Sequence, residues 1–198
     1  LTIGTDDKKV EVGNETVLYR HEKTFFHQPG LFVRLKDTVP LPEFEAAVER
    51  VRDYGVERVG IPLWIDGLAI ENASGDGATF GQYVAAVRAK TQQPLVLISS
   101  DAAAMAGALE HSNGSAPLIC AADASNWEAM ASLAAQHHAP IVVRGDGDLP
   151  KLAVLAEQVK AAGVEDIVLD PGVRNAHATL VLLTQLRRLA LKSNFRAL

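Results

Sequence analysis

The sequence predicts an α/β protein with a parallel sheet, of the (β/α) TIM-barrel type, and three observations predict it. Short apolar runs rich in β-branched residues recur along the chain. Each is followed by a stretch with the apolar spacing of an amphipathic helix, which is typical of parallel strands buried on both faces. The first connection, 36–40, contains no glycine, which argues against the dinucleotide-binding fingerprint of a doubly wound sheet.

The N-terminal part differs from this alternating pattern. Residues 9–12 and 16–19 are β-prone and flank Gly13-Asn14, which predicts a β-hairpin that turns there. We interpret it as a cover over one end of a domain rather than a domain of its own.

After Pro29, expected strands and helices alternate. The expected strands are 31–35, 68–72, 94–99, 117–121, 140–143 and 166–169. The expected helices are 42–54, 79–90, 101–111, 125–136, 149–162 and one from 175 onward, in which Leu183, Leu186 and Leu189 face inward.

Two kinds of helix start are expected. Asp101 is placed to cap its helix. Thr79 with Gln82, and Ser125 with Glu128, have the spacing of capping boxes.

The number of units sets the architecture. We count about six βα units, whereas a complete barrel has eight in about 250 residues. Either the sheet is open, which would leave the sixth strand as a bare edge, or the barrel is truncated. We expect two regions, a hairpin cover over 1–30 and a partial barrel over 31–198. The stretch that contains Gly60, Pro62 and Gly67 is expected to be irregular.

Composition excludes several function classes. The 198 residues carry a formal net charge of -5, so nucleic-acid binding has no electrostatic support. The single cysteine, Cys120, permits no disulfide within the chain, no iron–sulfur cluster and no cysteine-based zinc site, and we expect it to be a small buried side chain. No run approaches the roughly 18 apolar residues of a membrane span, and no signal layout begins the chain, so a cytoplasmic location is expected.

Candidate site residues follow the strands, because chemistry in a βα barrel sits at the carboxyl ends of its strands. Residues 72–76 supply Asn72, Ser74 and Asp76, which either orient a ligand in the barrel mouth or form a tight turn with Asp76 as helix cap. Asp170 begins an Asp-Pro-Gly turn that resembles the one in pterin-binding barrels such as dihydropteroate synthase, and we interpret it as ancestry more than activity.

Other polar residues indicate structural roles. Asp101, Asp123 and Asp146 precede helices, where capping explains a carboxylate. No catalytic set is expected, because the lone cysteine is expected to be buried and no nucleophile elbow occurs. No metal site is expected either, since His21 and His27 would need ligands from elsewhere.

Several motifs carry a resemblance to a known family. The longest is VGNETVLYRHEKTFFH at 12–27. Shorter matches lie at 57–60, 72–76 with Phe80, 126–128, 162–166 and 169–172. The chain resembles the large (gamma) subunit of the corrinoid iron–sulfur protein of the acetyl-CoA decarbonylase/synthase system, and the resemblance extends over nearly the whole chain.

The resemblance implies a fold and a role. That subunit joins a four-cysteine 4Fe-4S module, a pterin-binding-like barrel and a corrinoid module, and it pairs with a small barrel subunit. The system takes a methyl group from a methyltetrahydropterin through cobalt to acetyl-CoA synthase, in the Wood–Ljungdahl pathway of carbon fixation. This sequence matches the central barrel only, so we expect it to bind neither cofactor and to act as a non-catalytic scaffold that docks the small subunit. In the full system the partners also include the methyltransferase.

Two alternatives remain. A pterin-binding, methyltransferase-like barrel would use Asn72 and Asp170 in its mouth. A structural protein would complete its sheet by self-association along the sixth strand.

Overall fold

The computed structural model describes residues 1–5, 8–13 and 27–192. Its centre is a sheet of six parallel strands in the order β10-β9-β8-β7-β6-β3. The strands are β3 (Phe32–Lys36), β6 (Gly67–Glu71), β7 (Leu95–Ile98), β8 (Leu118–Ala122), β9 (Ile141–Arg144) and β10 (Ile167–Asp170). The helices are α1 (Leu41–Arg52), α2 (Gly77–Lys90), α3 (Ala102–Glu110), α4 (Trp127–His137), α5 (Leu149–Ala161) and α6 (Ala176–Lys192).

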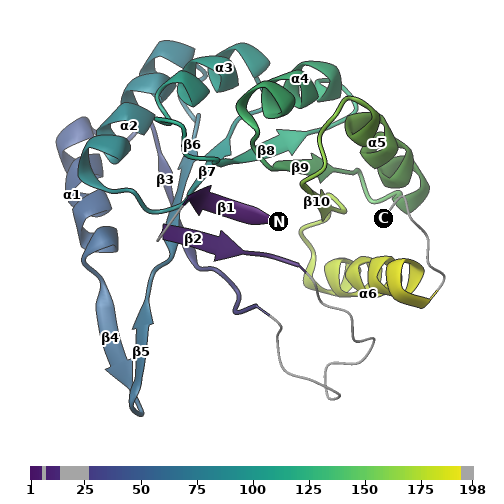
Figure 1. Ribbon diagram of the computed structural model, residues 1–198, viewed down its shortest axis with the longest axis horizontal. Helices are drawn as coiled ribbons and strands as arrows, with labels where there is room; N and C mark the ends of the chain where they lie inside the picture. Colours follow the sequence, from purple (N-terminus) through teal and green to yellow (C-terminus); the bar gives the residue numbers. More distant parts are fainter. Residues whose placement is uncertain (6–7, 14–26, 193–198) are drawn as a thin grey trace.

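The strand order follows the chain order without a reversal, and α1 to α5 follow one another along the outer side of the sheet (Figure 1). A doubly wound sheet reverses its order midway, so the barrel-type fold predicted from the sequence is confirmed. Within the described ranges, β3 and β10 are the two ends of the sheet, and the cylinder is not closed.

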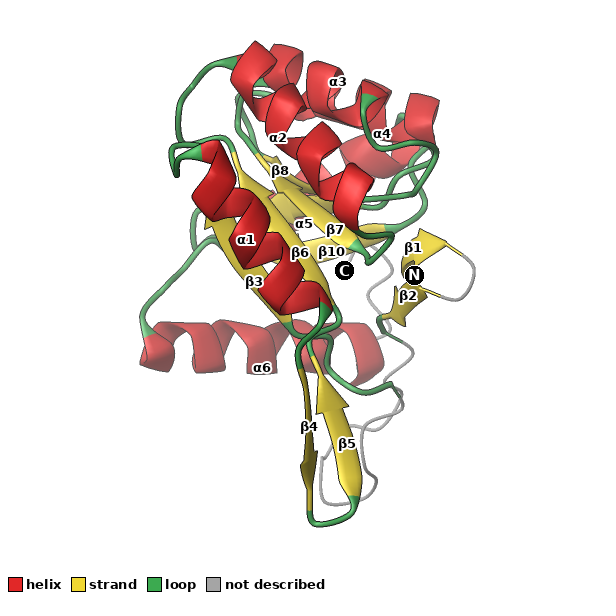
Figure 2. Ribbon diagram, turned by 90° about the vertical axis from the view of Figure 1, so that its left-hand side faces the viewer, coloured by secondary structure: helices red, strands yellow, loops and turns green. Residues whose placement is uncertain are grey.

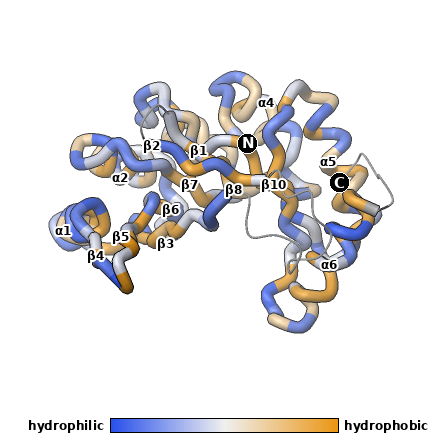
Figure 3. The backbone as a smooth tube through the Cα atoms, turned by 60° about the horizontal axis from the view of Figure 1, so that its bottom comes forward, coloured by the Kyte–Doolittle hydropathy of each residue, from blue (hydrophilic) through white to orange (hydrophobic). Residues whose placement is uncertain are grey.

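Alternating strand residues divide the core into two parts. One set, which includes Leu68, Ile70 and Ile141, packs against the helices and is fully buried. Neighbouring residues, such as Val142, point to the inner face of the sheet. Figure 3 shows hydrophobic residues along the strands of the central sheet, which is typical of a parallel sheet.

A small antiparallel hairpin covers part of the inner face. Its strands are β1 (Thr2–Thr5) and β2 (Lys8–Glu11). Ile3 is buried against Leu118 and Val142 of the sheet, and the Gly4 N–H donates to the Ala116 carbonyl at 3.0 Å, just before β8. The expected hairpin around Gly13-Asn14 lies partly outside the described residues, but its first strand pairs with β1.

A second hairpin was not predicted. β4 (Gly55–Arg58) pairs antiparallel with β5 (Ile61–Trp64), in the stretch expected to be irregular. Val59 and Gly60 form its two-residue turn with φ of 53° and 76°, the left-handed conformation that such turns need. Valine is rare at that position and Pro62 interrupts the strand pattern, so the usual sequence signals of a hairpin were absent.

Three local predictions were wrong. α2 is capped by Asp76, whose carboxylate accepts from the Thr79 N–H at 2.8 Å, so Thr79 and Gln82 form no capping box. α4 begins after Asn126 without a side-chain cap, and Ser125 contacts Asp123 instead.

The third concerns α6, where Leu186 is buried as expected but Leu183 is 46% exposed. In the described part of the chain no other helix packs over the side of α6 that carries Leu183, so Leu183 stays in contact with solvent.

No helix among the described residues has the length and apolarity that crossing a membrane requires.

Candidate functional site

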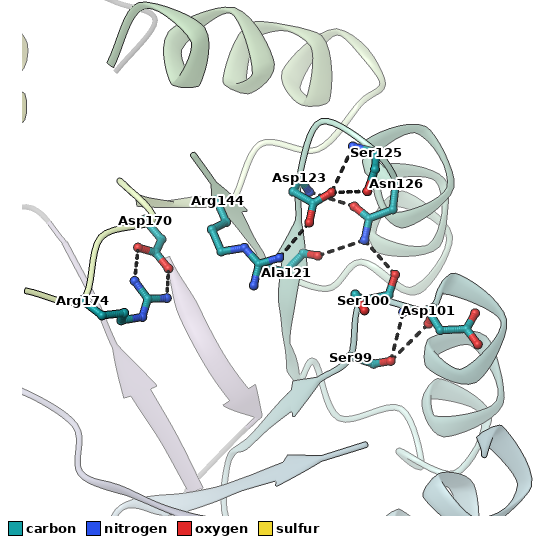
Figure 4. Close-up of polar contacts among 10 residues, drawn as sticks. All are labelled: Ser99, Ser100, Asp101, Ala121, Asp123, Ser125, Asn126, Arg144, Asp170 and Arg174. Carbon is teal, nitrogen blue, oxygen red and sulfur yellow. Dashed lines mark hydrogen bonds and ion pairs between the residues drawn. The ribbon is translucent and has the colours of Figure 1, made fainter. Parts of the chain in front are cut away.

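The carboxyl ends of the strands gather the charged side chains of the inner face. Three arginines there pair with carboxylates, and in each pair the arginine is the more exposed partner. The pairs are Arg34 with Glu71, Arg144 with Asp123, and Arg174 with Asp170. Figure 4 shows the last two pairs side by side at this end of the sheet.

The Arg34–Glu71 pair joins β3 to β6. Arg34 donates from Nε to Glu71 at 2.7 Å and also from Nη2. This hydrogen bonding lowers the pKa of the Glu71 carboxyl below its ordinary value and raises the pKa of Arg34. Glu71 is therefore ionised at neutral pH and occupied by its partner, which leaves it unsuited to act as a general base.

Asp123 lies at the end of β8 and is held from both sides. It accepts hydrogen bonds from the Ser125 hydroxyl at 2.6 Å and from Arg144 Nη2 at 2.7 Å. Burial alone would raise the pKa of the Asp123 carboxyl, but these bonds outweigh burial and leave the pKa below its ordinary value. The carboxylate is thus a fixed structural anion.

Asn126 ties two strand ends together (Figure 4). Its Oδ1 accepts from the Asp123 N–H at 2.8 Å, and its Nδ2 donates to the carbonyl oxygens of Ser100 and Ala121. The sequence motif at 126–128 gave no reason to expect this link, because Ser100 is remote in sequence.

Asp170 sits in the Asp-Pro-Gly turn after β10. It accepts from the Gly172 N–H at 2.9 Å and from Arg174 Nη2 at 2.7 Å. Burial would raise the pKa of the Asp170 carboxyl, but Arg174 and the Gly172 N–H lower it by more. The turn lies against the loop after β9, where the Gly147 N–H donates to the Pro171 carbonyl at 2.9 Å.

The segment after β6 is organised by a residue to which sequence analysis assigned no role. Asp37, which is 2% exposed, accepts from the N–H groups of Ala73 and Ser74 and from the Ser74 hydroxyl. Asn72 donates from Nδ2 to the Ser99 hydroxyl at 3.2 Å, and its Oδ1 accepts from the Gly75 N–H. A carboxylate directly after the first strand was the only signal for Asp37.

The predicted site residues therefore have partners within the chain. Asn72 and Ser74 shape the loop after β6, Asp76 caps α2, and Asp170 is bound to Arg174. They lie at the same end of the sheet, as expected, but the loops after β6 and β10 hold them in different hydrogen-bond networks.

Cys120 lies on the inner face of β8 and is half-buried rather than fully buried. Burial raises the pKa of its thiol, and the charge of Asp170 raises it further. Three arginines lower it by less: Arg34, Arg144 and Arg174. The thiol therefore stays protonated at neutral pH, which is the unreactive form.

The described residues contain no group of three His, Cys, Asp or Glu side chains placed to hold a metal ion. Of the two histidines weighed as ligands, His21 lies outside the described residues. His27 lies 3.8 Å from a carboxylate oxygen of Glu11.

Comparison with known families identifies the chain. The model of the family described as "CO dehydrogenase/acetyl-CoA synthase delta subunit" matches residues 1–198. The chain belongs to this family. The family description names the delta subunit, whereas the curated relatives below are named as gamma or large subunits.

Two curated proteins are similar along this chain. The corrinoid/iron-sulfur protein large subunit of Moorella thermoacetica is 37% identical over 197 residues, which are 100% of this chain and 44% of the relative. The acetyl-CoA decarbonylase/synthase complex subunit gamma of Methanothermobacter thermautotrophicus is 34% identical over 97% of this chain and 42% of the relative. The resemblance predicted from the motifs is confirmed, and the chain spans less than half the length of these relatives.

Solved structures support the fold of this family member. Dihydropteroate synthase from Thermus thermophilus superimposes with a TM-score of 0.61 at 19% identity, over 94% of this chain and 71% of that one. At this identity the likeness shows the barrel fold alone.

Proposed function

We propose that this chain is the scaffold and partner-docking barrel of a corrinoid iron–sulfur methyl carrier and does no chemistry of its own. In that role the chain is part of a cytoplasmic system that transfers a methyl group from a methyltetrahydropterin to acetyl-CoA synthase. Family membership and the names of the relatives support the pathway. One structural observation supports the scaffold role: the polar side chains at the carboxyl ends of the strands bind one another.

The iron–sulfur cluster of such a carrier does not fit the residues of this chain. A 4Fe-4S cluster needs four thiolate ligands, and the chain has one cysteine, Cys120. We propose that the cluster and the corrinoid belong to parts of the relatives that this chain does not match, and that the barrel connects them and docks the small barrel subunit.

Metal analysis tests the cofactor proposal. The chain is incubated with ferrous iron and sulfide, or with a corrinoid, then desalted and analysed for iron and cobalt. We expect only traces of both metals, and the corrinoid/iron-sulfur protein large subunit of Moorella thermoacetica treated in the same way should retain them. Stoichiometric iron or cobalt on residues 1–198 would overturn the proposal.

A pterin-binding barrel is the second candidate, because Asn72 and Asp170 do lie at the carboxyl ends of the strands. To bind a pterin, either side chain would have to give up its present partners. Calorimetric titration with methyltetrahydrofolate separates the two functions. The scaffold predicts no heat, whereas heat that disappears in Asn72→Ala, a variant checked for folding by circular dichroism, would favour the pterin-binding function.

A further inference from the structure

The β4–β5 hairpin stands away from the body of the barrel. The hairpin lies between α1 and β6 in the sequence, and it extends well beyond both elements (Figure 2). Every residue of β4 and of β5 is exposed, and in the described part of the chain the two strands pair only with each other. An isolated two-stranded hairpin is marginally stable in water, so such a projection gains stability when another surface covers it.

One face of the hairpin is apolar. The register places Val56 opposite Leu63 and Arg58 opposite Ile61, so these four side chains share a face. Val56, Ile61 and Leu63 are 44%, 58% and 45% exposed. We call these three residues with Arg58 the hairpin face. At the tip, Val59 is 94% exposed and has a φ of 53°, which is costly for a β-branched residue.

The edge of β5 is poorly suited to adding a strand. In a hairpin with a two-residue loop, the pair next to the closing pair is not hydrogen-bonded, so the backbone nitrogen of Pro62 points outward. Proline has no N–H to donate there. A partner is therefore expected to cover the hairpin face rather than to extend the sheet from β5.

Charge argues for a different protein rather than a second copy. The hairpin face carries Arg58 and no carboxylate, while Glu57 is on the opposite face with Pro62. Arg58 has no ion pair among the described residues. Two copies docked through this same face would bring two arginines together without a counter-charge, and burying unpaired charge is costly.

We propose that the hairpin face docks into an apolar groove on another protein subunit, which offers a carboxylate to Arg58. The proposal rests on the function proposed above, that this barrel docks partner subunits, and names the surface that does so. Arg58 then gains the ion pair that the described residues do not provide, and the three apolar side chains leave water.

Two matched substitutions test this surface in the protein co-expressed with the other subunits of its complex. Ile61→Glu places a charge on the hairpin face, and Val154→Glu places one on α5 at a residue that is equally exposed, 56% against 58%. We expect Ile61→Glu to weaken subunit association at least about tenfold and Val154→Glu to leave it unchanged. Arg58→Glu should also weaken association, and more at low salt than at high salt.

Amide hydrogen exchange on the unsubstituted protein provides a readout that does not depend on a variant folding. Exchange across 55–64 should be fast in the purified subunit and slow in the assembled complex. If the complex assembles and exchange stays fast, the hairpin is not the docking surface, although the barrel still docks. If the unsubstituted protein does not join a complex at all, the proposed function itself fails.

Two further results would assign the face to a different occupant. Slow exchange at 55–64 in the purified, monomeric subunit would show that its own chain covers the hairpin. A dimer of the subunit that becomes monomeric in Ile61→Glu would show that a second copy does. Either result overturns the proposal.

Discussion

The carboxylate of Asp37 holds Ser74 through two hydrogen bonds, from the Ser74 N–H at 2.7 Å and from its hydroxyl at 2.6 Å. Asp37 follows β3 and Ser74 follows β6, so the contact fastens the carboxyl ends of two adjacent strands. At 2% exposure, Asp37 has almost no water to replace these donors. The loop after β6 therefore depends on a residue from a different βα unit.

Asp37→Asn should destabilise the protein. The substitution keeps the shape but replaces an accepting oxygen with an amide group that faces other donors, which costs about 1–3 kcal/mol of unfolding free energy. Urea denaturation followed by circular dichroism measures it. The control is Asp146→Asn at an exposed position, expected to change stability by less than about 0.5 kcal/mol. Equal stability of the two variants would contradict the role of Asp37.

Gly172→Ala should be more destabilising than Gly163→Ala. Both glycines have positive φ, 81° and 95°, which alone costs an alanine about 1–2 kcal/mol. A Cβ at Gly172 would also clash with the Gly145 carbonyl oxygen, whereas a Cβ at Gly163 meets nothing within 4 Å. Thermal unfolding of both variants checks this ranking, and the reverse order would refute the close packing of the Asp-Pro-Gly turn.

Acid should weaken the fold partly through Asp123. The pKa of this carboxyl is lower in the folded protein than its ordinary value of 3.8, because the hydrogen bonds from Ser125 and Arg144 outweigh burial. The folded state then binds fewer protons than the unfolded state, so the contribution is complete above that value and is lost as pH falls through the lowered pKa. Asp123→Asn should flatten the fall in stability below about pH 4.

The measurement is the urea midpoint at a series of pH values. Asp166→Asn serves as control, because the Asp166 side chain is exposed. A curve for Asp123→Asn that parallels the unsubstituted protein throughout the acid range would rule out the linkage.

Arg88 is a buried cation without a carboxylate partner in the described chain. It is 4% exposed, donates to the Gln93 carbonyl and the Ser115 hydroxyl, and leaves Nε without a hydrogen-bond partner. Burial lowers the pKa of Arg88 to about 10. Arg88→Met keeps most of the packing and removes the buried charge, so its stability should stay within about 1.5 kcal/mol of the original.

Arg88→Ala removes the packing as well and should cost about 2–5 kcal/mol, by analogy with other large-to-small core substitutions. Chemical denaturation of both variants tests the comparison. If Arg88→Met were as damaging as Arg88→Ala, the guanidinium hydrogen bonds would be the dominant contribution.

The local sequence pattern was sufficient to predict the individual strands and helices of this fold. The strand expected at 68–72 is observed as β6, and the cap expected from Asp101 binds the Ala103 N–H at 2.8 Å. Such features depend on residues a few positions apart, whose spacing is visible in the sequence. The family resemblance had the same basis, since its motifs are contiguous.

Only the tertiary structure decided what the polar residues after the strands do. Asn72 was ambiguous between a ligand contact and a turn because its partner, Ser99, is 27 residues away, and Asp37 binds Ser74 at a separation of 37. The strand order and the projecting β4–β5 hairpin are likewise settled by which segments pair in space. A sequence displays periodicity along the chain, but hydrogen-bond partners and exposed faces depend on distances that exist only after the chain has folded.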